Sequence, residues 1–111
     1  MIINKKTGSG ITIIAPAGRL DAATAEDFLK SSSALTDPQS IVIDFSGIDF
    51  IDSSGLGTLV GIAREKRRAD ADVKLACLNE KARMVFETTQ AFRLFDIYDD
   101  ADTAAEAAAK S

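Results

Sequence analysis

The first apolar residues of the chain are spaced as in two short strands. Residues 2–6 and 11–15 carry paired isoleucines, and the segment 7–10 between them holds two glycines, as a hairpin loop does. This segment lacks the spacing of a phosphate-binding P-loop and is interpreted as a turn. Because proline has no backbone N–H and glycine weakens a strand, Pro16 and Gly18 are predicted to end the second strand.

A helix and a buried strand are predicted next. Asp21 is a suitable N-cap for a helix over residues 22–30. A turn at residues 36–39 leads to residues 40–45, which are almost continuously apolar and β-branched. That pattern is typical of a strand buried on both faces, and Ser46-Gly47 ends it.

The segment after Asp52 has the period of an amphipathic helix. At about 100° per residue, four residues form the stripe expected to face the core: Leu56, Leu59, Val60 and Ala63. Ser54, Gly57 and Gly61 fall on another side, with Thr58 and Glu65 beside them. Ile62 is predicted to flank this flat side as an exposed apolar contact. Residues 64–68 are interpreted as a solvated basic helix end, which suits the negative end of the helix dipole.

The rest of the chain alternates between strand and helix. The predicted elements are a strand at 73–78, a third helix capped by Asn79, an extended segment at 94–98, and a final alanine-rich helix that starts at Asp100 or Asp102. Strands and helices that alternate after a hairpin predict the α/β class with a mixed sheet. The length of 111 residues, with no internal repeat or linker, predicts one domain over residues 1–111.

The composition excludes several classes of function. A formal net charge of −4 argues against nucleic acid as the main partner. The single cysteine, Cys77, excludes an internal disulfide. No apolar stretch is long enough to span a membrane, and the N-terminus lacks the order of a signal peptide. We therefore expect a cytoplasmic protein without membrane insertion.

The chain contains no histidine. A Ser-His-Asp hydrolase is excluded in its usual form, because no imidazole can take the serine proton. A zinc site is nearly excluded, since the chain offers one thiol and no imidazole. We expect no catalytic residue, no metal and no cofactor, and so a protein that is not an enzyme.

The hexapeptide Asp52-Ser53-Ser54-Gly55-Leu56-Gly57 is the most informative motif. It follows a buried strand and opens a helix, where free N–H groups and the positive dipole end suit a phosphate. The two glycines let another backbone come close. Ser54 is either an ordinary helix-start residue or a phosphate acceptor, and the second interpretation is favoured because Asp52 or Ser53 can supply the cap. Asp52 is interpreted either as that cap or as a group that orients the serine hydroxyl.

Three features together resemble the STAS domain family: the segment Gly18-Arg19-Leu20-Asp21, the hexapeptide, and Asn79 before a helix. The similarity is greatest to bacterial anti-sigma factor antagonists of the SpoIIAA and RsbV type. It implies a mixed sheet of four or five strands flanked by helices. The chain departs from many relatives at residues 88–92, where it lacks the turn glycine.

The resemblance also implies a switch. In that family the second serine of the motif, here Ser54, accepts phosphate from the partner anti-sigma factor, an ATP-dependent serine kinase. A PP2C-type phosphatase removes the phosphate. The unphosphorylated protein binds the anti-sigma factor and frees the sigma factor, and the phosphorylated form does not.

The partner is expected to lie on the start and open side of the helix after Asp52. The residues predicted to meet it are Asp21, Asp52, Ser53, Ser54, Gly55, Gly57, Thr58, Gly61 and Ile62. A glycine inside a helix costs roughly 1 kcal/mol relative to alanine, so Gly57 and Gly61 indicate close packing with a partner or a neighbouring loop. A phosphate adds about −1.5 to −2 charge, which is expected to block docking without unfolding the chain.

Two other functions stay open at this point. The chain is alternatively a constitutive STAS subunit of a transport or stress-signalling complex that is never phosphorylated. An enzyme with Ser54 as nucleophile would need a lysine or aspartate base, and no lysine lies near the motif in sequence.

Overall fold

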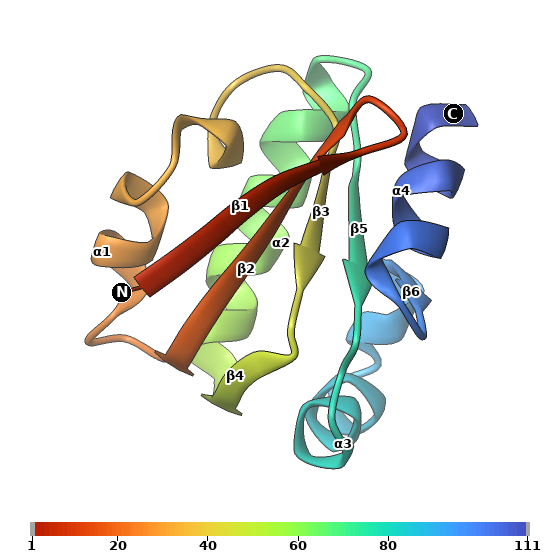
Figure 1. The fold of residues 1–111 in the computed structure, drawn as a ribbon. Helices are drawn as coiled ribbons and strands as arrows, with labels where there is room; N and C mark the ends of the chain where they lie inside the picture. The colour runs from red at the N-terminus through yellow and green to blue at the C-terminus, as the bar shows by residue number, and fades with distance from the viewer. Residues whose placement is uncertain (1, 111) are drawn as a thin grey trace.

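A mixed sheet forms the centre of the fold (Figure 1). The computed structural model describes residues 2–110. The strands are β1 (Ile2–Gly8), β2 (Ile11–Leu20), β3 (Ile41–Asp44), β4 (Gly47–Ile51), β5 (Val73–Ala76) and β6 (Asp96–Tyr98). β1 and β2 pair antiparallel, and the path continues through β3, β5 and β6 in parallel, while β4 pairs with β2 off this path. The sequence predicted four or five strands; the described chain forms six.

Helices cover both faces of the sheet (Figure 1). The larger core lies under three of them, α1 (Ala25–Lys30), α2 (Ser53–Arg68) and α3 (Glu80–Thr88). The other face carries α4 (Ala101–Lys110), which packs on Ile13 and Val42 through alanines. Two short 3-10 helices, η1 (Ser33–Leu35) and η2 (Ala91–Arg93), lie in connections. The predicted α/β class is confirmed.

β2 continues to Leu20, so the prediction that Pro16 and Gly18 end it was wrong. Residues 12–14 pair with β3 and residues 17–20 pair with β4. Pro16 lies between these two sets, so its missing N–H removes no bond from the ladders with β3 and β4. On the other side of β2 it pairs with Ile3 of β1. Gly18 has φ 107° and the register shifts after it, which marks a bulge and not an end.

β4 was not predicted, because its residues do not alternate. Ile48 and Ile51 are both buried although they are three residues apart. Gly18 pairs with Ile48 and Arg19 with Phe50, so Asp49 is an extra residue in β4, and this register shift accommodates the spacing. β4 therefore depends on its neighbour, and its own sequence carries no strand signal.

The turn after α3 forms without a glycine. Gln90 takes the left-handed conformation, with φ 59° and ψ 19°, at the position where glycine is favoured. For a residue with a Cβ this conformation is unfavourable by about 1 kcal/mol. The departure of residues 88–92 from the family pattern thus leaves the turn intact.

Lys66 lies inside the fold, whereas the run 64–68 was predicted to be solvated. Its side chain is 1% exposed. The ammonium donates to the carbonyl oxygens of Ala34 and Asp37 and to Asp37 Oδ1, the last at 3.0 Å. These bonds hold the segment after α1 against α2. The other residues of the run are exposed as predicted.

Candidate functional site

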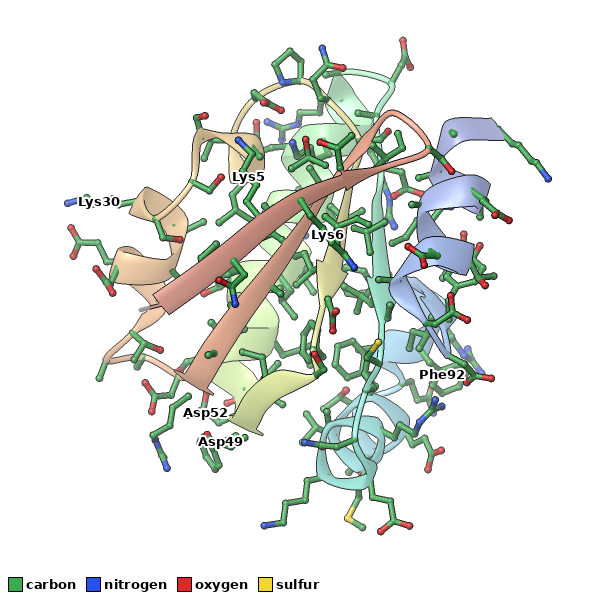
Figure 2. The ribbon with its side chains drawn as sticks, in the orientation of Figure 1. Lys5, Lys6, Lys30, Asp49, Asp52 and Phe92 are labelled. Atoms are coloured by element: carbon green, nitrogen blue, oxygen red, sulfur yellow. The ribbon has the colours of Figure 1, made fainter. Side chains whose placement is uncertain are left out.

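α2 begins at the edge of the sheet where the parallel strands end. β4 leads into Asp52, and the Asp52 N–H donates to the carbonyl oxygen of Leu20, at the end of β2, over 3.4 Å. Asp49 and Asp52 lie together at this edge in Figure 2. Because Asp21 follows Leu20 directly, the end of β2 brings it to the start of α2.

Asp52 is the N-cap of α2, as one of the two interpretations of it predicted. Its Oδ1 accepts a hydrogen bond from the N–H of Gly55 at 2.9 Å. Ser53 and Ser54 are both exposed. Within residues 2–110 neither serine hydroxyl has a hydrogen-bond partner, and neither do the N–H groups of these two residues. A free hydroxyl therefore lies beside two free donors at the positive end of the helix dipole.

The cap makes a direct test possible. Replacing Asp52 with alanine is expected to lower the free energy of unfolding by about 1 kcal/mol, because the Gly55 N–H loses its acceptor. Asp52→Asn should keep most of the stability, since an amide oxygen also caps. Urea denaturation of both variants measures the difference. An alanine variant as stable as the parent protein would show that the cap contributes nothing.

Gly55 is where two backbones meet, as predicted for the motif. A Cβ placed on Gly55 would lie 2.1 Å from the carbonyl oxygen of Leu20 and 2.8 Å from its carbonyl carbon. No side chain fits in that space. Gly57 differs, because a Cβ there would meet no atom of the described chain within 4 Å apart from the backbone of its own helix. The close approach is therefore confirmed at the first glycine and absent, within this chain, at the second.

Asp21 caps a turn before α1 and not the helix itself. Its Oδ1 accepts from the N–H groups of Ala23 and Thr24 at 3.0 and 3.1 Å. Arg19 Nε donates to Asp21 Oδ2 at 3.2 Å, and this bond lowers the pKa of the Asp21 carboxyl below its ordinary value. The Arg19 guanidinium also lies 4.0 Å from the centroid of the exposed Phe50 ring. Sequence reasoning missed this pair because it missed β4.

One side of α2 is open to solvent near its start and middle. Ser54, Gly57 and Gly61 are exposed, and a Cβ on either glycine would meet nothing within 4 Å in the described chain. The predicted flat stripe is confirmed, and no neighbouring loop of residues 2–110 packs on its glycines. The prediction that Ile62 is exposed was wrong: only 4% of it is accessible. It joins the larger core because α1 and η1 lie beside that side of α2.

A groove of about 430 Å³ separates α1 and η1 from α2. Its lining is mainly apolar and consists of Leu29, Leu35, Thr36, Thr58, Gly61, Ile62 and one charged residue, Glu65. Ile62 thus lines the groove while it remains part of the core. The sequence predicted the α2 side of this groove but not the opposite wall. That wall comes from Leu29, in the predicted helix 22–30, and from Leu35 and Thr36, at the start of the predicted turn.

Two negative findings apply to residues 2–110. They contain no group of three or more histidine, cysteine, aspartate or glutamate side chains placed to hold a metal ion. None of their helices combines the length and hydrophobicity that crossing a membrane requires.

Comparison with known proteins decides the family. A model of the STAS domain matches residues 3–104. The chain belongs to the STAS domain family. Two relatives are similar over much of this STAS chain. BtrV of Bordetella bronchiseptica, assigned as an anti-sigma factor antagonist, is 27% identical over 100 residues, which are 88% of this chain and 86% of BtrV. The anti-sigma-B factor antagonist of Listeria monocytogenes is 31% identical over 75 residues, 66% of each chain.

Solved structures share the STAS fold. A Thermotoga maritima protein assigned as an anti-sigma factor antagonist has a TM-score of 0.81 at 25% identity, with 96% of this chain and 93% of that chain covered. Unphosphorylated SpoIIAA, an anti-sigma factor antagonist, has a TM-score of 0.71 at 21% identity, with 96% of each chain covered. The murine anion transporter Slc26a9 matches 95% of this chain with 18% of its own length, at a TM-score of 0.77 and 17% identity. The last two likenesses show the fold alone.

Proposed function

We propose that this STAS protein is an anti-sigma factor antagonist that is switched by phosphorylation of Ser54. In its unphosphorylated form it binds an anti-sigma factor that is also a serine kinase, and this binding frees a sigma factor. The kinase transfers phosphate from ATP to Ser54, which ends binding, and a PP2C-type phosphatase restores the active form. The protein then acts in the cytoplasm, where sigma factors work.

The free Ser54 hydroxyl is the observation that carries the proposal. Asp52 supplies the cap, so the hydroxyl has no structural bond to lose when it is modified. The residue is exposed, so a kinase can reach it. The free N–H groups of Ser53 and Ser54 favour a phosphate at this place. The names of the two relatives support the class of partner.

The open side of α2 explains how the switch would block binding. Gly57 and Gly61 allow a partner to approach the helix backbone closely. A phosphate on Ser54 adds bulk and about −1.5 to −2 charge to that surface. Asp52 and Asp21 already place two carboxylates at this end of α2, so a phosphate increases the like charge that a partner meets.

The nucleophile alternative has no support at this site. Within residues 2–110 the Ser54 hydroxyl bonds to no carboxylate and no amine, so it lacks an activating base. The alternative function, a constitutive STAS subunit, is tested by the binding experiment described below. It predicts a partner that binds regardless of Ser54.

Phosphotransfer and binding to the purified anti-sigma factor kinase of the same organism test the proposal. With labelled ATP, we expect phosphate on the parent protein and on Ser53→Ala, and none on Ser54→Ala. Ser54→Asp should bind the kinase at least about 30-fold more weakly, ~2 kcal/mol, because it places a charge in the interface. Ser54→Ala should bind as the parent does. Equal binding of Ser54→Asp and the parent would refute the switch, and such binding without any phosphotransfer would favour the constitutive subunit.

A further inference from the structure

The groove between α1 and α2 is preformed. Leu35 and Thr36 make its outer wall, and they lie between Ala34 and Asp37, the two residues whose oxygens bind the Lys66 ammonium. Lys66 belongs to α2, so the same helix lines one side of the groove and fixes the distance to the other. A partner that enters this groove does not have to order its wall first.

The groove is continuous with the surface around Ser54. Ser54, Thr58 and Gly61 lie within about 60° of one another around α2, and about 10 Å separates the first from the last along the axis. The Thr58 hydroxyl donates to the Ser54 carbonyl oxygen at 3.1 Å, so the groove begins one turn from the serine. Any protein that covers Ser54 along α2 comes to lie at the mouth of the groove.

Gly61 keeps the mouth open. Apart from the backbone of its own helix, a Cβ there would meet no atom of the described chain within 4 Å, although glycine weakens a helix. Nothing in the packing of residues 2–110 requires a glycine at this position. The absent side chain instead leaves the mouth of the groove open beside the half-buried Leu29, while Ile62 lines the groove with little of its own surface exposed.

We infer that the groove receives an apolar side chain of the anti-sigma factor when that protein docks over Ser54. This inference rests on the proposed function and adds the chemistry of the contact. The volume of about 430 Å³ accommodates a leucine, methionine or phenylalanine with room for part of a second residue, and the lining is mainly apolar. The partner is therefore held at two places, by a polar contact at Ser54 and by an apolar anchor between the helices. Buried anchors of this kind commonly carry most of the binding energy of an interface.

Filling the groove from inside tests the inference. Gly61→Leu places an aliphatic side chain at the mouth, in space that is empty of protein atoms. Binding to the purified anti-sigma factor kinase, measured by titration calorimetry, should weaken at least tenfold, and the smaller Gly61→Ala should weaken it less. Thermal melting of both variants should show no loss of stability, since each residue favours a helix more than glycine does. Arg64→Leu is the matched control, because it adds the same side chain to an exposed position on α2 that does not line the groove.

Three outcomes separate the inference from the proposed function. Loss of binding in Gly61→Leu with normal binding in Arg64→Leu supports the apolar anchor. Binding of Gly61→Leu within twofold of the parent overturns it, while weak binding of Ser54→Asp in the same series leaves the switch standing. A parent protein that does not bind the kinase overturns the proposed function and the inference with it.

Discussion

Gly55→Ala is expected to lower the free energy of unfolding by about 4 kcal/mol or more. The added Cβ would lie 2.1 Å from the Leu20 carbonyl oxygen, and backbone atoms cannot rotate away as a flexible side chain does. Either α2 or the end of β2 has to move, and both pack on the larger core. For a domain of this size such a loss lowers the melting temperature by about 15 °C. Thermal melting followed by circular dichroism measures it.

Gly57→Ala is the control for this substitution. It makes the same chemical change two residues further along α2, where the Cβ meets nothing within 4 Å of the described chain. We expect it to gain up to about 1 kcal/mol, because alanine favours a helix. If the two variants melted at the same temperature, the contact between Gly55 and Leu20 would not be the constraint described above.

Lys66→Ala is expected to cost about 3 kcal/mol of stability. The substitution removes a buried ammonium that donates to two carbonyl oxygens and one carboxylate oxygen. It leaves those acceptors without their donor and opens space beneath the segment that follows α1. Chemical denaturation with urea measures the loss, and hydrogen exchange of residues 33–37 should rise with it.

Two further variants identify the cause of that loss. Lys66→Met keeps most of the apolar stem, so a cost similar to that of alanine assigns the effect to the ammonium. Arg68→Ala removes an exposed cation from the same helix end, where its pair with Glu65 is solvated on both sides, and should cost less than about 0.5 kcal/mol. A methionine variant as stable as the parent would show that the buried ammonium contributes no net stability.

Local signals in the sequence predicted the elements that depend on a few neighbouring residues. Asn79 was predicted to cap a helix, and a cap was one of the two interpretations of Asp52. Each accepts an N–H three residues later, from Ala82 and Gly55. A cap acts within one turn, so its partner is visible in the sequence. One failure is local, because Asp21 was predicted to cap the helix and caps a turn before α1 instead. The other failures involve distant partners. Whether Pro16 ends β2 depends on where β3 and β4 lie beside it, and no local pattern contains that information.

In the candidate site too, features that depend on local sequence were predicted better than features that depend on distant residues. Helical periodicity predicted that Ser54, Gly57 and Gly61 share an exposed side, which the structure confirms. It misplaced Ile62, because periodicity treats a helix as isolated and α1 lies against that side. The charged run at residues 64–68, and not the periodicity, misplaced Lys66. A charged residue is buried only where enough oxygens surround it, and those come from residues 34–37. The roles proposed for the site residues remain predictions.

The contact between Gly55 and the Leu20 carbonyl has a consequence for signalling. It locks the first turn of α2 to the end of β2, so a group added to Ser54 has no easy path by which to tilt or unwind the helix. Under the proposed function, both forms of the protein then share one backbone. A switch without a change of shape draws no free energy from its own conformation, so the whole difference in affinity has to arise where the partner touches it. No conformational change then has to follow dephosphorylation, so the protein can bind its partner as soon as the phosphate is removed.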